Sequence, residues 1–365
     1  PLGPPGKGWV TTRDLARAVL EDEPYPLRGL INFGSNFRLT KPATPGMEEM
    51  LKRLDLYVHI DLFENPTASF ADFLLPAASP WERSGLAAGF QLGELGEALL
   101  QLRPAVVPPR GESRSDSNIV FDLAERLGLS RQFFDGDREA ALRHVLAPSG
   151  LDAETLRAHP QGLPAAGPTL HRKYKQEGFA TPSGRIEIYS ERLLAAGHAP
   201  LPCFNENNRQ PEASYPLALT TAKWPQFCHS QHRALPSLRR RLPEPLVQIH
   251  PDTAAARGIA DGQWIVLQTS VGRMQAKAHF DNGIRSDTVC AQYGWWEACP
   301  QLGLPGHALG GVHNGSYNAL ISGERFDPIS GSNGLRTEFC QVAPLPPDTG
   351  TIPITDAKSA PENTP

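Results

Sequence analysis

Short runs rich in valine, isoleucine, threonine and aromatic residues recur in the later part of the chain, separated by glycine, aspartate and asparagine. This pattern is typical of a compact all-β module. The sequence therefore predicts a small closed barrel with strands over residues 215–221, 246–249, 264–269, 271–280 and 288–292. A short helix is expected between the second and third strands. There, Pro251 suits a first helical turn, Asp252 is favourable at the positive helix end, and Gly258 can form a left-handed C-cap.

The first sixty residues show a different pattern, in which a strand, a helix and a second strand follow one another. Residues 12–23 fit an amphipathic helix. An apolar strand over 27–36 then runs into a small polar turn, a helix covers 47–54, and a second strand covers 55–63. This succession is a βαβ unit, which binds ligands at the carboxyl ends of its strands. Four candidate residues fall at those ends: Gly34, Ser35, Asn36 and Asp61.

The rest of the chain sets the predicted domain organisation. Helices are expected over 116–127, 138–146 and 151–159, whereas the Gly-, Glu- and Pro-rich stretch 81–114 is expected to be irregular. The sequence thus predicts an α/β domain over 1–198, a linker over 199–214, a β-barrel over 215–345 and a loosely held tail over 346–365.

Composition narrows the function classes. The net charge of −4 gives no reason to expect a nucleic-acid partner, and no run of about 18 apolar residues predicts a membrane span. The five cysteines form no C-x-x-C pair, which argues against a disulfide framework, a zinc site or an iron–sulfur site in this chain. Nothing in the sequence decides the compartment, and we expect the cytoplasm before the periplasm.

Several residues have structural and functional interpretations side by side. His250, His279 and His307 are expected to be ordinary surface or core histidines, and Trp296 to be either barrel core or a ligand wall. The basic run 239–241 is expected to be a solvated loop, with phosphate contact as the alternative. Asp348-Thr349-Gly350 is the tripeptide of aspartic proteases, but it lies in the Pro-rich tail, and one barrel alone would not supply the two carboxylates.

Two separated stretches resemble one family. In the barrel region these are Val247-Gln248-Ile249-His250-Pro251-Asp252, Arg257-Gly258-Ile259-Ala260-Asp261-Gly262, Val271-Gly272-Arg273, Tyr293-Gly294-Trp295-Trp296 and Asn318-Ala319-Leu320. Near the βαβ unit, Thr67-Ala68, Asp72 and Pro76 match a second signature, although Asn65-Pro66 stands where that signature often has Thr-Glu. Both resemble the dimethyl sulfoxide reductase superfamily of molybdenum and tungsten oxidoreductases.

The resemblance implies a Rossmann-like βαβ domain followed by a double-psi β-barrel, together binding molybdopterin guanine dinucleotide with Mo or W. Donors for its phosphates and acceptors for its guanine and pterin amines are then expected on the polar loop after the first barrel strand and at the strand ends. The implied cofactor-binding residues are Gly34, Ser35, Asn36, Asp61, Thr67, Thr221, Lys223, His229, Ser230, Gln231, Trp295, Asn314 and Asn318.

The resemblance also implies two-electron redox or oxygen-atom transfer on a small-molecule substrate. Gly294-Trp295-Trp296-Glu297 resembles the polysulfide and thiosulfate reductase branch. The family's metal ligand and iron–sulfur cysteines lie in an amino-terminal half without a counterpart here. We therefore expect the carboxy-terminal portion of such an enzyme, working with that half or with a catalytic partner chain and an iron–sulfur electron-transfer subunit. The alternative is a non-catalytic cofactor-binding subunit.

Overall fold

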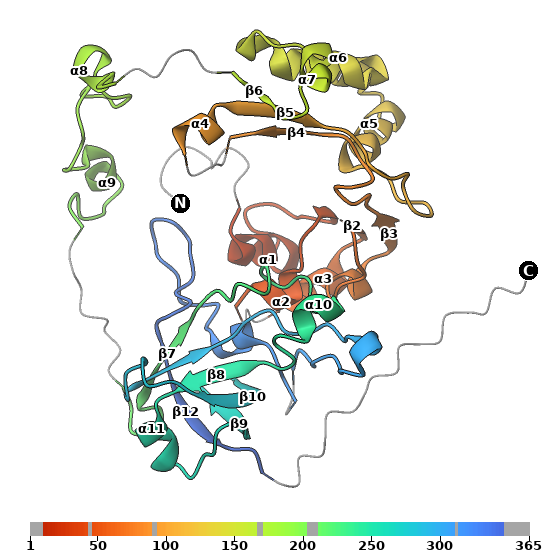
Figure 1. Cartoon of the computed structure of the whole chain (residues 1–365). Helices are drawn as coiled ribbons and strands as arrows, with labels where there is room; N and C mark the ends of the chain where they lie inside the picture. The colour runs from red at the N-terminus through yellow and green to blue at the C-terminus, as the bar shows by residue number, and fades with distance from the viewer. Residues whose placement is uncertain are drawn as a thin grey trace, which may run out of the picture. The chain divides into compact units, whose positions relative to one another are not determined.

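The computed structural model describes residues 10–42, 46–89, 93–165, 171–202, 211–310 and 313–346. It shows a mixed α/β fold with a closed β-barrel, as the sequence predicts (Figure 1). The chain forms two compact units. The barrel unit comprises residues 1–29, 36–55 and 191–365, and the sheet unit comprises residues 30–35 and 56–190. Each unit combines segments that are distant in sequence, so this division does not test the predicted domain boundaries, which stay predictions.

Within the described residues, six strands close the barrel, in the order β10-β8-β11-β7-β12-β9. β8 runs parallel to β10 and β7 runs parallel to β11, whereas the other neighbouring pairs are antiparallel. Alternate side chains fill the core, among them Leu219, Val247, Ile249, Ile265 and Leu267. The strands are β7 (Leu217–Thr221), β8 (Leu246–Ile249), β9 (Trp264–Gln268), β10 (Arg273–Phe280), β11 (Thr288–Ala291) and β12 (Glu338–Pro344).

Five of these strands confirm the predicted ones, with ends that differ by a residue or two. β12 was not predicted as a strand. Its buried positions alternate, but two of them are Glu338 and Cys340, and the strand ends at Pro344, so neither a simple apolar alternation nor a β-rich composition marks it.

Two glycines of the barrel stand at turns for different physical reasons. The predicted helix is α11 (Pro251–Ala255), and Gly258 has the expected left-handed φ of 64° just beyond it. Gly272 stands at the β9–β10 hairpin, where a Cβ would lie 2.4 Å from Ala319 O. Close backbone approach therefore accounts for the second glycine.

Short helices complete the barrel unit. α1 (Thr12–Leu20) begins at the Thr11 side chain, which accepts the Asp14 N–H, and it packs against α3 (Met47–Arg53). Both helices confirm the prediction. No helix among the described residues has the length and apolar character needed to cross a membrane. The remaining helices of this unit are α2 (Phe37–Thr40), α9 (Glu191–Ala195), α10 (Pro236–Arg239), the 3-10 helix η4 (Pro300–Leu302) and the 3-10 helix η5 (Tyr317–Leu320).

The sheet unit contains the two strands predicted for the βαβ unit, β1 (Gly29–Phe33) and β2 (Leu56–Asp61). A third strand, β3 (Phe73–Pro76), pairs with β2 in parallel, from Val58 opposite Phe73 to Asp61 opposite Pro76. The order across this sheet is β1-β2-β3. The 3-10 helix η1 (Ala68–Phe70) lies between β2 and β3 along the chain.

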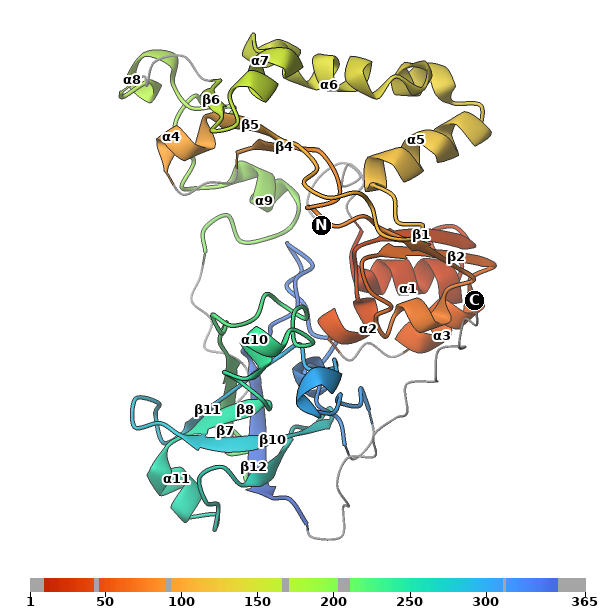
Figure 2. The ribbon, with the colours of Figure 1, turned by 45° about the vertical axis from the view of Figure 1, so that its right-hand side comes forward.

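The expectation that residues 81–114 are irregular is wrong. β4 (Gly85–Ala88) and β5 (Leu99–Arg103) form an antiparallel hairpin, and β6 (Leu163–Pro164) pairs with β5. Leu102 packs with Leu146 and Leu156, so α6 and α7 lie over this sheet (Figure 2). The helices of this unit are α4 (Glu94–Glu97), α5 (Asp116–Arg126), α6 (Arg138–Leu146), α7 (Ala153–Ala158), α8 (Tyr174–Glu177), η2 (Ser130–Gly136) and η3 (Ala147–Ser149).

Candidate functional site

A polar loop, residues 222–233, follows β7 and carries most of the donors that the sequence analysis singled out. Lys223, His229 and Gln231 have exposed side chains, whereas Thr221 and Ser230 are buried. The Thr221 hydroxyl donates to Ala291 O at 2.7 Å and so ties the end of β7 to β11. The loop thus presents an ammonium, an imidazole and an amide to solvent from a backbone that is anchored at its start.

The Arg233 side chain turns inward and binds the backbone of this same loop. Its guanidinium donates to His229 O at 2.8 Å, to Gln231 O at 3.3 Å and to Tyr293 O at 2.6 Å. Burial lowers the pKa of Arg233 to about 10, so the group is still charged at neutral pH. Charge-assisted bonds of this kind are stronger than neutral ones and fix the curvature of the loop.

Residues 293–297 form hydrogen bonds with the loop and so restrain its backbone. Trp296 Nε1 donates to Ser230 O at 2.8 Å. Glu297 Oε2 accepts the backbone N–H groups of Arg233 and Ala234 at 2.7 and 3.2 Å. Burial raises the pKa of Glu297, and the two backbone donors act against that rise. We define residues 293–297 as the clamp.

Gly294 lets the clamp touch the loop. A Cβ at this position would lie 2.5 Å from His229 O, so a larger residue would force the loop away. His229 and His232 have left-handed φ values of 50° and 73°, which side chains with a Cβ rarely adopt without support. The loop conformation is therefore imposed by its surroundings.

Trp295, predicted to contact the cofactor, is fully buried. The guanidinium carbons of Arg239 and Arg233 lie 4.8 and 5.1 Å from its ring centroid, and its Nε1 donates to Gln292 Oε1 at 3.0 Å. Phe227 and His307 pack edge-on against the ring. Any contribution of Trp295 to binding consequently passes through the loop that it supports.

The expectation that residues 239–241 form a solvated basic loop is wrong for Arg239, which is fully buried. Its guanidinium donates to Pro243 O, Glu297 O and Pro305 O at 2.7, 2.9 and 3.1 Å. The carbonyls of Glu297 and Pro305 come from a distant part of the chain, and together with Pro243 O they replace water around the charge. Arg239 therefore joins the clamp to its neighbours, whereas Arg240 and Arg241 are exposed.

His307 is a core histidine, as the sequence analysis expects. It is 6% exposed, and burial lowers its pKa from 6.5 to about 3, with smaller contributions from the charges of Arg239 and Arg233. The imidazole is therefore neutral at physiological pH. Its Nε2 lies 3.5 Å from Glu244 Oε2.

The two predicted asparagines of the barrel unit serve the backbone. Asn314 Nδ2 donates to Arg273 O and Ser316 O at 2.7 and 3.2 Å, and its Oδ1 accepts the Ser316 N–H at 2.9 Å. Asn318 Nδ2 donates to Leu39 O at 2.7 Å and so fastens η5 to α2. Both side chains are buried.

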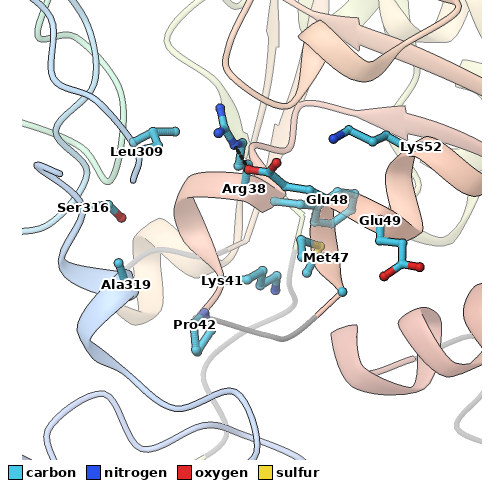
Figure 3. A pocket seen from close by; sticks show the side chains of 12 residues that line it. Arg38, Lys41, Pro42, Met47, Glu48, Glu49, Lys52, Leu309, Ser316 and Ala319 are labelled. Atoms are coloured by element: carbon cyan, nitrogen blue, oxygen red, sulfur yellow. Dashed lines mark hydrogen bonds and ion pairs between the residues drawn. The ribbon is translucent and has the colours of Figure 1, made fainter. Parts of the chain in front are cut away.

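A pocket with a volume of about 540 Å³ lies beside this junction of η5 and α2 (Figure 3). Arg38, Lys41 and Lys52 supply positive charge to its wall, and Glu48 and Glu49 supply negative charge. Arg38 Nε pairs with Glu48 Oε1 at 2.7 Å. Ser316 and Ala319, which flank Asn318 by one or two positions, complete the opposite wall.

The predicted residues of the sheet unit lie at the carboxyl end of its strands. Gly34 has a left-handed φ of 58°, its N–H donates to Ile60 O at 2.8 Å, and a Cβ there would meet no atom within 4 Å. Asp61 is partly exposed, and Thr67 is buried with its N–H on Asn65 Oδ1 at 2.9 Å. Asn36 instead precedes α2 in the barrel unit.

Sequence reasoning missed three buried polar residues of the sheet unit: Asn32, Tyr57 and His59. Tyr57 and His59 alternate with apolar residues along β2 and share the face of Asp61, which is the signal that could have shown them. Burial raises the pKa of Tyr57 to about 12, so the phenol is uncharged at neutral pH.

The part of the chain that the structure describes contains no group of three or more His, Cys, Asp or Glu side chains that could hold a metal ion. The cysteines described, Cys228, Cys290, Cys299 and Cys340, are free thiols. Asp348, on which the protease interpretation depends, lies outside the described residues. In the barrel unit, the exposed donors of the loop suit phosphate oxygens. In the sheet unit, the Asp61 carboxylate and the open space at Gly34 leave room for a polar ligand at the strand ends.

Comparison with known proteins matches two stretches of the chain to families. Residues 217–338 match the molydopterin dinucleotide binding domain, and residues 26–126 match the molybdopterin oxidoreductase family. The fold is similar to that of acetylene hydratase from Pelobacter acetylenicus, with a TM-score of 0.78 and 27% identity, over 91% of this chain and 46% of that one.

Two relatives illustrate the range of similar sequences. Acetylene hydratase of Syntrophotalea acetylenica is 29% identical over 340 residues, which are 88% of this chain and 44% of the relative. The thiosulfate reductase molybdopterin-containing subunit of Salmonella typhimurium is 27% identical over 357 residues, which are 89% of this chain and 44% of the relative. The chain thus spans less than half the length of either protein.

Proposed function

This chain belongs to the molybdopterin oxidoreductases of the dimethyl sulfoxide reductase superfamily, and from that membership we propose that it binds molybdopterin guanine dinucleotide carrying molybdenum or tungsten. The observation that carries the proposal is the loop of residues 222–233. Two of its exposed donors, His229 and Gln231, belong to a backbone segment that Arg233, Trp296 and Glu297 hold in one conformation. A backbone that is fixed before binding loses little conformational entropy when the ligand arrives.

Individual residues have distinct proposed roles. The Lys223 ammonium donates to a phosphate, and His229 and Gln231 donate to phosphate or pterin oxygens. Asp61 accepts hydrogen bonds from the guanosine end, and Gly34 leaves room for the ligand at the strand end. The bound group supplies two-electron redox chemistry, while this chain binds and orients it.

The buried members of the predicted set act through the backbone. Thr221 and Asn314 are engaged with carbonyl groups of the fold, Ser230 accepts from the clamp, and Trp295 packs beneath the loop. We propose that these residues place the loop and its neighbours and do not touch the cofactor through their side chains.

We further propose that the complete enzyme carries out redox or oxygen-atom transfer on a small molecule. One relative is named a hydratase and another a reductase, so neither name identifies the substrate of this enzyme or its branch of the superfamily. Metal ligation and any iron–sulfur cluster are proposed to come from polypeptide beyond these 365 residues, which the 44% coverage of both relatives supports. A cofactor-binding subunit without its own catalysis is the second candidate on the same ground.

We also propose that the sheet unit is Rossmann-like and that the barrel is a double-psi β-barrel. Parallel pairing of β2 with β3 supports a Rossmann-like arrangement in the sheet unit. The two parallel pairs in an otherwise antiparallel barrel support a double-psi arrangement.

The test is the metal, pterin and guanine nucleotide content of the protein, purified with any polypeptides that accompany it. We expect pterin and guanine nucleotide to be released by acid. Loss of one charge-assisted bond, about 1.5–3 kcal/mol, should weaken retention roughly 10- to 100-fold in Lys223→Ala. Lys175→Ala, at an exposed lysine of α8, is the matched control. Preparations without pterin would refute the proposal, and unchanged retention would remove Lys223 from the site.

A further inference from the structure

A file of polar side chains runs along one face of β2 toward Asp61. Tyr57, His59 and Asp61 occupy alternate positions, so they point to the same side of the sheet. Tyr57 is 0% exposed and His59 is 1% exposed, whereas the Asp61 side chain is 20% exposed. The file therefore begins in the interior and ends at a carboxylate that a ligand can reach.

Asn65 links this file to Asp61, and its orientation is fixed. Asn65 Oδ1 accepts the backbone N–H groups of Thr67 and Ala68 at 2.9 and 3.2 Å. The opposite end of the amide, Nδ2, is consequently the atom that lies 2.8 Å from Asp61 Oδ2 and 3.1 Å from His59 Nε2. An amide nitrogen has two hydrogens, so Asn65 can donate one to each.

The remaining hydrogens follow from this assignment. If His59 Nε2 accepts from Asn65, the imidazole carries its hydrogen on Nδ1, which lies 2.7 Å from the Tyr57 oxygen and donates to it. Asn32 Nδ2 lies 3.3 Å from the same oxygen and donates its other hydrogen to Ser35 O at 2.9 Å. Asn32 Nδ2 is also 3.0 Å from His59 Nδ1, so Asn32, Tyr57 and His59 form one cluster of polar contacts.

At the exposed end of this file, the Asp61 carboxylate can accept further hydrogen bonds. Oδ1 accepts the Leu62 N–H at 2.6 Å, and Oδ2 accepts from Asn65. A carboxylate offers about four acceptor positions, so one on each oxygen is available to a ligand. Two adjacent N–H or O–H donors, as on a guanine edge or a ribose diol, match that pair.

We infer that Asn65, backed by His59 and Tyr57, is the positioning residue that aims the Asp61 carboxylate at the guanosine end of the dinucleotide. This inference rests on the proposed function. It also accounts for the place where the sequence departs from the family signature, because Asn65 supplies an amide donor to Asp61 and an acceptor to two backbone N–H groups.

The decisive variant is Asn65→Asp, measured on the protein with its accompanying polypeptides. Aspartate keeps the acceptor for Thr67 and Ala68 but loses the donor, and it sets a second carboxylate against Asp61. We expect the dissociation rate of the guanine nucleotide to rise at least tenfold. Tyr57→Phe, which touches no ligand, should raise it by a smaller factor. Tyr317→Phe is the matched control, because this equally buried tyrosine donates to Leu335 O in the barrel unit.

The exchange of both residues, Asp61→Asn with Asn65→Asp, separates positioning from plain stability. It restores an amide–carboxylate hydrogen bond in the reverse direction, so thermal stability should recover while nucleotide retention should not. Recovery of both would show that Asp61 acts within the fold alone and would overturn the inference. Wild-type protein without guanine nucleotide would overturn the proposed function itself. Nucleotide that is present and unaffected by Asn65→Asp would overturn this inference and leave the proposed function standing.

Discussion

Gly294→Ala should release the loop of residues 222–233 from the clamp. The added Cβ would lie 2.5 Å from His229 O and 3.0 Å from both Arg233 Nη2 and Ser230 Cα. Ordinary van der Waals contact begins at 3.4 Å, so the carbonyl has to retreat by the 0.9 Å between these distances. A shift of that size exceeds the whole range of roughly 2.7–3.2 Å over which N–H···O hydrogen bonds form, so the 2.8 Å bond from Arg233 to His229 O should distort or break.

The expected loss of stability has two parts. Gly294 has a left-handed φ of 83°, a conformation that costs a residue with a Cβ about 1–2 kcal/mol. Loss of a charge-assisted hydrogen bond adds about 1.5–3 kcal/mol. The free energy of unfolding should therefore fall by roughly 2.5–5 kcal/mol, and cofactor retention should fall with it.

Gly303→Ala provides the control for the backbone part alone. Gly303 has a left-handed φ of 64°, and a Cβ there would meet no atom within 4 Å. Urea unfolding of both variants, with amide hydrogen exchange of the segment 222–234, separates the two contributions. We expect about 1–2 kcal/mol for Gly303→Ala and faster exchange in the loop for Gly294→Ala alone. Equal losses with unchanged exchange would refute the clamp.

Two further outcomes are expected. Arg239→Met leaves the carbonyls of Arg233, Pro243, Glu297 and Pro305 without this donor and should lower the free energy of unfolding by roughly 3 kcal/mol or more. Arg240→Met at the exposed neighbour should change it by less than about 0.5 kcal/mol, and similar losses in urea unfolding would contradict the buried role of Arg239. Because the pKa of His307 falls from 6.5 to about 3 on folding, the unfolded chain binds an extra proton between these values, so stability should drop as the pH falls through that window. His307→Gln should remove on the order of 3–5 kcal/mol of that drop, and a variant with the wild-type pH profile would show that His307 is not its source.

The sequence predicts those elements whose local pattern agrees with their environment. β8 and α6 begin and end where the periodicity places them, since alternating or helical apolar positions face a core in each case. The β4–β5 hairpin escapes prediction because glycine and glutamate surround two short strands, and its stability comes from packing on α6 and α7. Tertiary packing overrides local composition there.

For the candidate site, the sequence locates donors but not their directions. Lys223 and Arg233 belong to one polar loop, yet the first is exposed and the second is buried. What separates them is Tyr293 O, a carbonyl 60 positions further along that accepts from Arg233. Arg239 differs from Arg240 for the same reason. Which charged side chain turns inward depends on carbonyl groups that only the folded chain brings near.

The closure of the barrel by β12 has a consequence for synthesis and folding. β12 pairs with β7 at Glu338 opposite Leu219, which are 119 positions apart (338 minus 219), and also pairs with β9. Contacts between such distant residues form slowly. On the ribosome, β7 and β9 emerge long before their shared neighbour, and until it arrives each has an unpaired edge that can recruit another chain. Nascent chains that stall before Glu338 should therefore aggregate, and the timing of barrel formation is set by the last strand to be made.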